Sequence, residues 1–128
     1  LSDIGFDISI PLNKVQAFVR EMEFRAGSLV KNLRMCHMGH LGDGNLHYAI
    51  FPPEEDPDAL NLKSEEIKKA VYDAISSFDG SFSAEHGIGT SKLFAMNNYK
   101  DPVALDIMQQ IKVKLDPKMI MNPGKLLP

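Results

Sequence analysis

The sequence has little of what several protein classes require. Cys36 is the only cysteine among 128 residues, so no disulfide can form within the chain and a reducing compartment is expected. There is no run of Lys or Arg and the formal net charge is −3, which argues against a nucleic-acid partner or an anionic-membrane patch. No apolar run is long enough to span a bilayer, and the opening residues lack the pattern of a signal peptide. We therefore expect a cytoplasmic protein without a transmembrane segment.

Hydrophobic residues make up 44% of the chain, which is enough for one core. Their spacing alternates between strand and helix periods. The predicted elements are a strand at 6–10, a helix at 12–25, hairpin arms at 32–40 and 45–51, a helix at 62–78 and a fourth strand at 80–85. This order is the split βαβ pattern of a ferredoxin-like fold, with helices on one face of an antiparallel sheet. The sequence therefore predicts an α+β fold.

The remaining residues predict C-terminal helices and an extended tail. The expected elements are a polar helical piece at 91–98, a helix from Pro102 to Asp116 and a turn at 122–125. Asp101 followed by Pro102 is the pattern of an N-cap with proline at the first helical position. We therefore divide the chain into a ferredoxin-like unit at 1–100 and a C-terminal helix and tail at 101–128.

Two histidines flank a tight-turn signal at 39–47, where the sequence is GHLGDGNLH. A two-residue Asp43-Gly44 turn would fix the register of the hairpin. The pairs would then be Gly42 with Asn45, Leu41 with Leu46 and His40 with His47. Directly paired residues share a face with Cβ atoms about 4.5–5.5 Å apart, which suits two imidazoles that bind one divalent metal. The alternative is that the glycines only form a turn and the histidines are ordinary polar residues near it.

A second cluster lies at 83–89, where the sequence is SAEHGIG. Glu85 offers a carboxylate beside the imidazole of His86, and the glycines permit close backbone approach. Neighbours on a regular strand point to opposite faces, so we expect these two side chains to do different jobs. Two histidines and one glutamate form a metal-binding set that leaves positions open for water or substrate. The alternative is a solvated, idle Glu–His pair at a strand end.

Both faces of the predicted hairpin are largely apolar. One face carries Cys36, Met38, His40, His47, Ala49 and Phe51, and the other carries Met35, His37, Leu41, Leu46, Tyr48 and Ile50. A small antiparallel sheet usually shows water one polar face. We therefore expect one layer from the helices of this chain and another from a second domain, another subunit or a cofactor. A local excess of hydrophobic residues is the alternative.

Taken together, three motifs closely resemble the C-terminal domain of FAD-linked oxidases. The motifs are the segments at 39–47, 83–89 and 121–125, in this order. That domain is the cap of the glycolate oxidase, D-lactate dehydrogenase and D-2-hydroxyglutarate dehydrogenase group, within the vanillyl-alcohol-oxidase class of flavoproteins. The resemblance runs from about residue 7 to 128. It implies that this chain is the second of two ferredoxin-like units in a cap over a separate FAD-binding domain, which this chain does not contain.

The resemblance also implies roles for individual residues. The ligands of a divalent metal, usually zinc, would be His40, His47 and Glu85. The metal would bind the hydroxyl and carboxylate of a 2-hydroxy acid and lower the pKa of the hydroxyl. His86 would take the hydroxyl proton as the catalytic base, and hydride would pass to FAD. Asn122 would approach the flavin ring. For Asn45, a hairpin-turn role and a contact to flavin or substrate both stay open.

The implied parent protein oxidises a D-2-hydroxy acid to the 2-oxo acid and passes electrons to an acceptor. Dicarboxylate-specific members of the group tend to have Asn two residues after the second motif histidine, whereas this chain has Ala49, which argues against D-2-hydroxyglutarate. The group also allows a homo-oligomer, a location peripheral to the inner membrane and, in eukaryotes, a mitochondrial one. The chain alone is expected to be inactive.

Two other functions stay open. A stand-alone zinc-dependent hydrolase would use Glu85 or His86 as its base, and it requires a third close ligand and a pocket closed by this chain alone. A non-catalytic ferredoxin-like ligand-binding or interaction module would bind its partner equally well after both motif histidines are replaced by alanine.

Overall fold

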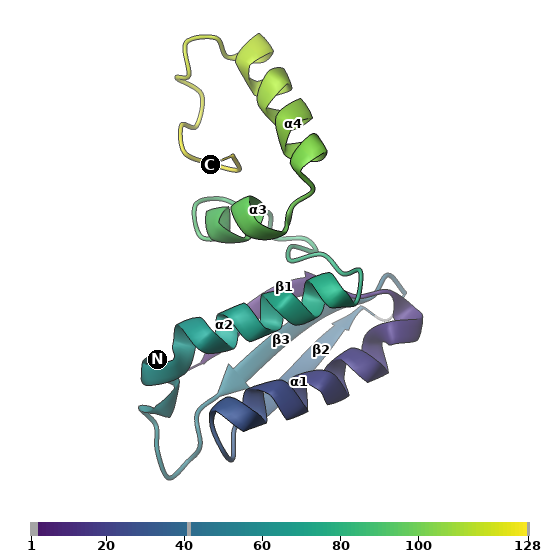
Figure 1. Cartoon of the computed structure of the whole chain (residues 1–128), viewed down its shortest axis with the longest axis vertical. Coiled ribbons are helices and arrows are strands. Elements are labelled where there is room, and N and C mark those ends of the chain that lie inside the picture. The colour runs from purple at the N-terminus through teal and green to yellow at the C-terminus, as the bar shows by residue number, and fades with distance from the viewer. Residues whose placement is uncertain (1–2, 41, 128) are drawn as a thin grey trace. The chain divides into compact units, whose positions relative to one another are not determined.

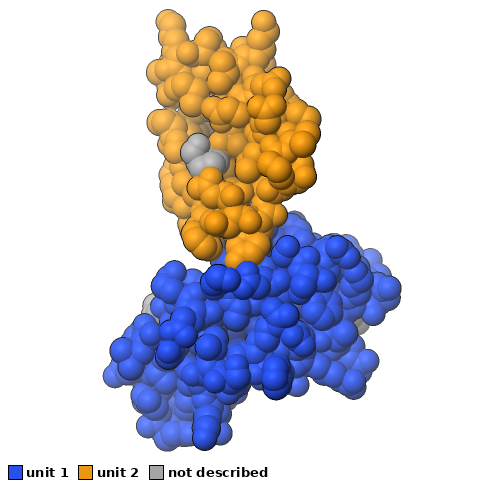
Figure 2. Space-filling view, in the orientation of Figure 1, with its two compact units in different colours: residues 1–86 blue, residues 87–128 orange. Residues whose placement is uncertain are grey.

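The computed structural model describes residues 3–40 and 42–127, drawn in Figure 1. These residues form two compact units, at 1–86 and 87–128, which Figure 2 shows in different colours. We call them unit 1 and unit 2.

Unit 1 is an antiparallel sheet with two helices on one face. The sheet has the order β1-β3-β2, and the elements are β1 (Ile4–Ser9), α1 (Val15–Leu29, after a 3-10 turn at Leu12–Lys14), β2 (Arg34–His40), β3 (Asn45–Phe51) and α2 (Ala59–Ser77). Both helices lie on the same side of the sheet (Figure 1). The predicted α+β fold, with helices on one face of an antiparallel sheet, is confirmed.

The predicted fourth strand at 80–85 is wrong. In the described part of the chain this segment makes an isolated bridge, in which Ser9 and Ser81 exchange backbone hydrogen bonds of 2.9 and 2.8 Å. Beyond Ser83, the amide of Ala84 donates both to the carbonyl of Asp7, at 3.3 Å, and to its side chain. The amides of Glu85 and His86 donate to the side chain of Asp7, so this carboxylate takes donors that a longer strand would have used.

The predicted ends of the elements also shift. Helix α1 does not end at 26–28 but continues to Leu29, because Ala26 lies fully buried in the core and its carbonyl accepts the amide of Val30 at 3.1 Å. Helix α2 begins at Ala59, ahead of the predicted start at 62, because Ala59 and Leu60 are buried. Strand β1 spans 4–9 where 6–10 was predicted.

The core of unit 1 lies between the helices and one face of the sheet. Its buried side chains are Ile4, Phe6, Ile8, Ile10, Phe18, Met22, Ala26, Leu46, Tyr48, Ile50, Leu60, Ile67, Val71, Ala74 and Ile75. Phe18 makes edge-to-face contacts with Tyr48 and Phe78, with ring centroids 6.0 and 5.8 Å apart. Burial raises the pKa of Tyr48, whose hydroxyl donates to the sulfur of Met35. On the opposite face, Met38 is 64% exposed, and what covers this face in the parent protein stays a prediction.

Unit 2 consists of two helices and a tail. The helices are α3 (Leu93–Tyr99) and α4 (Pro102–Leu115). The Asp101 side chain accepts the amide of Ala104 at 2.8 Å, which confirms the predicted N-cap with proline at the first helical position. The amide of Lys125 donates to the carbonyl of Asn122 at 3.3 Å, which confirms the predicted turn. Across the described residues of both units, every helix is too short or too polar to cross a membrane.

Candidate active site

The hairpin that carries the first histidine motif has a different register from the predicted one. His40 pairs with Asn45, and Met38 pairs with His47, so the two histidines are diagonal neighbours and the predicted direct pairing is wrong. Leu46 pairs with Gly39. Its predicted partner was Leu41, which lies outside the described residues. A shift of two residues keeps each side chain on its face, so His40 and His47 share a face as expected.

Two local hydrogen bonds explain the longer loop. The amide of Asn45 donates to the Asp43 side chain at 3.1 Å, and the amide of Asp43 donates to the carbonyl of His40 at 3.3 Å. The carbonyl of Gly44 accepts the amide of Ile10 at 3.0 Å, so Gly44 faces the end of β1 and does not close a two-residue turn. The φ of Gly44 is 71°, a conformation that favours glycine.

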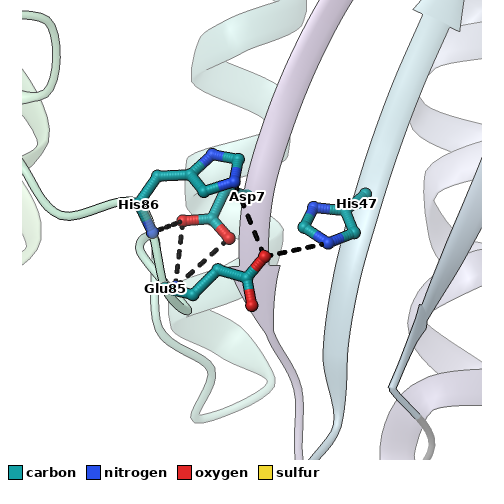
Figure 3. A group of neighbouring side chains, drawn as sticks. All are labelled: Asp7, His47, Glu85 and His86. Carbon is teal, nitrogen blue, oxygen red and sulfur yellow. Dashed lines mark hydrogen bonds and ion pairs between the residues drawn. The ribbon is translucent and has the colours of Figure 1, made fainter.

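The fold brings the second motif against β3. Nε2 of His47 lies 3.2 Å from Oε1 of Glu85, and Nε2 of His86 lies 3.6 Å from the same oxygen (Figure 3). The imidazoles of His47 and His86 stack with ring centroids 5.5 Å apart and planes 25° apart. Together with Asp7, these residues form a group whose candidate ligand atoms lie within 4.8 Å of one another. We call Asp7, His47, Glu85 and His86 the Glu85 cluster.

His40 lies at the margin of this cluster. Its ring centroid is 6.4 Å from that of His47, and its side chain is exposed. Rings that share a tetrahedral zinc lie with centroids about 5 Å apart, because each Zn–N bond is about 2.0–2.1 Å long. His40 would therefore have to rotate toward His47 to share a metal with it, and its exposed position leaves room for that rotation. Its role as a ligand stays a prediction.

Asp7 is the member of the cluster that was not predicted from the sequence. It lies on β1 opposite His47 and is 4% exposed. Its Oδ2 accepts the backbone amides of Ala84, Glu85 and His86 at 3.2, 3.2 and 2.9 Å. A charged residue between Phe6 and Ile8 on β1 was the available signal, since a buried carboxylate requires donors.

Asn45 is buried in this site. Its Nδ2 donates to Oε2 of Glu85 at 2.9 Å, while its Oδ1 is buried without a hydrogen-bond partner among the described residues. Asn45 is thus a residue of the hairpin end that contacts the second motif, whereas the flavin or substrate contact stays a prediction.

Asn122 belongs to unit 2. It is exposed on the turn after α4, with a φ of 48°. Its predicted approach to a flavin ring concerns a part of the parent protein outside this chain and stays a prediction.

The chemistry of the cluster fits a divalent metal. Imidazole nitrogens and a carboxylate oxygen are the donors that zinc and similar transition metals prefer. The side chains of His47, Glu85 and His86 are 33%, 46% and 64% exposed, so they remain accessible from solvent. The group can hold a cation and still present an imidazole to a substrate.

This arrangement defines a class of domain: an α+β layer that displays imidazoles and a carboxylate on the sheet face opposite its helices. The family model for the C-terminal domain of FAD linked oxidases matches residues 3–126. The chain belongs to this family, which confirms the resemblance that the three motifs carried.

Relatives of the chain are dehydrogenases from distant organisms. D-2-hydroxyglutarate dehydrogenase of Stutzerimonas stutzeri is 36% identical over 121 residues, which cover 94% of this chain and 26% of the relative. The mitochondrial D-2-hydroxyglutarate dehydrogenase of Danio rerio is 42% identical over 123 residues, which cover 96% of this chain and 22% of the relative. The mitochondrial D-2-hydroxyglutarate dehydrogenase of Arabidopsis thaliana is 39% identical over 123 residues, which cover 96% of this chain and 21% of the relative. The chain thus spans about a quarter or less of the length of these relatives.

Proposed function

We propose that this chain is the C-terminal, substrate-facing domain of a larger FAD-dependent dehydrogenase that oxidises a D-2-hydroxy acid to the 2-oxo acid. The family match and the names of the relatives support this proposal. A separate FAD-binding domain of the parent chain would be its partner. The relatives from Danio rerio and Arabidopsis thaliana are named as mitochondrial. The location, the electron acceptor and the oligomeric state of this protein stay predictions.

The observation that carries the proposal is the position of Glu85. One of its oxygens lies between the imidazoles of His47 and His86, which come from two motifs far apart in the sequence. We assign His47 and Glu85 to a divalent metal, with His40 as a further ligand after rotation. When bound, the metal would supply the positive charge that lowers the pKa of a nearby hydroxyl, and FAD would accept a hydride.

His86 then has the position of a general base. Its side chain is the most exposed of the three, so its imidazole can reach a hydroxyl of a substrate held beside His47. Nε2 of His86 would take the hydroxyl proton, and Oε1 of Glu85, 3.6 Å away, would stabilise the resulting positive charge. In this assignment His47 and Glu85 bind the metal, and His86 removes the proton.

The residues paired across the sheet at Ala49, two positions after His47, concern the specificity for the substrate. Ala49 pairs with Gly5 of β1 on one side and with Cys36 of β2 on the other, so three small uncharged residues cross the sheet there. Such a row offers no partner to a second carboxylate of the substrate. The relatives are named for D-2-hydroxyglutarate, so we propose that any second carboxylate of the substrate is bound outside this row. In the parent protein, Ala49→Asn should therefore leave kcat/KM for D-2-hydroxyglutarate relative to D-lactate unchanged, and a raised ratio would contradict this part of the proposal.

The test of the assigned roles uses the full-length protein that carries this domain. Zinc affinity of the metal-depleted protein is measured by titration, and flavin reduction by a D-2-hydroxy acid is followed by stopped-flow absorbance. Glu85→Gln and His40→Ala should weaken zinc binding, whereas His86→Ala should slow flavin reduction and leave zinc bound.

Two results would contradict these roles. Loss of zinc in His86→Ala with normal zinc binding in His40→Ala would make His86 the ligand. Turnover without flavin would favour the hydrolase.

A further inference from the structure

We propose, on the basis of the function proposed above, that Asp7 and Asn45 are positioning residues that hold Glu85 from two sides. Asp7 fixes the backbone of Glu85 from β1, and Asn45 fixes one oxygen of its carboxylate from β3. The second oxygen is thereby directed at His47 and His86. Neither positioning residue is assigned to the metal itself.

Asp7 acts on the backbone. Three successive amides, from Ala84 to His86, donate to its Oδ2, and the hydroxyl of Ser83 adds a contact of 3.4 Å. These donors converge on one buried oxygen, so the segment 83–86 has little freedom to move away from β1. Four donors leave Oδ2 poorly suited to bind a metal ion, because its lone pairs are already used, and Oδ1 also accepts the amide of Glu85, at 3.3 Å.

Asn45 acts on the side chain of Glu85. A carboxylate can only accept, so the amide nitrogen of Asn45 must face Oε2, as the 2.9 Å distance shows. With Oε2 engaged, Oε1 is the oxygen that faces Nε2 of His47 at 3.2 Å. Asn45 therefore selects which oxygen of Glu85 is offered to a cation, and it favours binding through one oxygen.

The side-chain oxygen of Asn45, Oδ1, indicates that this residue lowers the stability of the fold. Oδ1 is buried without a hydrogen-bond partner in the described chain, and a buried unpaired acceptor is unfavourable for folding. Glu85 is 46% exposed, so water could satisfy Oε2 if Asn45 were absent. Asn45 thus contributes more to the geometry of Glu85 than to the stability of the fold.

The experiment measures metal binding and stability of the same variants. The full-length protein is freed of metal and titrated with Zn²⁺ and with Co²⁺, and the Co²⁺-loaded samples are examined by electron paramagnetic resonance. Asn45→Leu, which is similar in size, should weaken Zn²⁺ binding about tenfold or more and change the Co²⁺ spectrum. Its urea midpoint should be equal to or higher than that of the wild type. In a Glu85→Gln background, Asn45→Leu should cause no further loss, because it acts through Glu85.

The outcomes separate this proposal from the function on which it rests. Unchanged Zn²⁺ affinity in Glu85→Gln would remove the proposed metal site. Weakened binding in Glu85→Gln with normal binding in Asn45→Leu would overturn only the positioning role. Loss of stability in Asn45→Leu with unchanged metal affinity would also overturn it, since that is the result of a purely structural role.

Asp7 is tested with a matched control. Asp7→Asn should weaken Zn²⁺ binding without adding to the effect of Glu85→Gln. An additive loss would instead make Asp7 an independent ligand and would contradict the proposal. Asp116 is also a buried aspartate that accepts two backbone amides, but it lies in unit 2, so Asp116→Asn should leave Zn²⁺ affinity unchanged.

Discussion

The two units of this chain differ in how far their helices bury apolar side chains. In unit 1, both helices bury an apolar stripe against the sheet, and Phe18, Ile67 and Val71 are fully buried. In the described part of unit 2, Ala95 and Met96 are the buried apolar residues, and α4 buries none. Unit 1 therefore has a core of its own, whereas α4 of unit 2 leaves its apolar side chains half-buried or exposed in this chain.

This difference shows that helix periodicity and burial are separate properties. The stripe of α4 has the spacing of a core-facing helix, yet Ile111 is 54% exposed and Leu115 is 75% exposed. The periodicity predicted the helix correctly, and the N-cap at Asp101 fixes where it starts. The apolar stripe is available for surfaces outside this chain, in line with the proposed parent protein.

The largest expected effect comes from truncating one apolar side chain in each unit. Phe18→Ala should lower the free energy of unfolding by about 3–5 kcal/mol, because it leaves a cavity between Tyr48 and Phe78. Ile111→Ala on α4 should change it by about 0.5 kcal/mol or less, because that side chain is already exposed. Urea unfolding of the chain followed by circular dichroism measures both. Similar losses in the two variants would contradict the contrast between the units.

A pair of glycines in unit 1 should give effects of opposite sign. A Cβ at Gly39 would lie 1.9 Å from the carbonyl oxygen of Asn45, so Gly39→Ala must push β2 away from β3. We expect a loss of about 1–3 kcal/mol, the usual range for overpacking. A Cβ at Gly27 in α1 meets nothing within 4 Å, so Gly27→Ala should stabilise the helix by about 0.5–1 kcal/mol. Thermal melts of the two variants should therefore move in opposite directions.

The smallest effect is the pH dependence of the tail of unit 2. A hydrogen bond from Lys112 holds the pKa of Asp116 below its ordinary value, and the amides of Ile120 and Met121 add to this effect. Because the pKa is lower in the folded state, the ionised carboxylate stabilises the fold above the unfolded-state pKa, and this contribution is lost as the pH falls through the folded-state pKa. Asp116→Asn should remove this part of the acid sensitivity. Amide hydrogen exchange at 120–121, compared at neutral and acid pH, measures it; equal pH profiles for the variant and the wild type would contradict the role of Asp116.

Much of unit 1 could be predicted from the sequence because its signals are local. The spacing of Phe18 and Met22 predicts α1, and the alternation in 45–51 predicts β3. The face shared by His40 and His47 was also predicted, since a register error of two residues leaves faces unchanged. These features depend on residues close together in the chain.

The features that could not be predicted depend on distant partners. The register of the hairpin depends on the amide of Ile10, which takes the carbonyl of Gly44 out of a two-residue turn. The fourth strand fails because Asp7 accepts the amides of 84–86. The stacking of His47 on His86 follows from the same contact. A single sequence gives no measure of which distant donor an acceptor will find.

The link between Asp7 and the segment 83–86 also sets when the site can form during folding. Asp7 and His86 are 79 positions apart, so their hydrogen bond closes a loop of almost the whole of unit 1. Such a contact carries the entropy of loop closure and forms after the local hairpin and helices. On the ribosome, the cluster cannot assemble until the segment at 84–86 has emerged. Metal binding at the proposed site should therefore report the completed fold of unit 1, and a metal ion added during refolding should bind late, in step with the final phase.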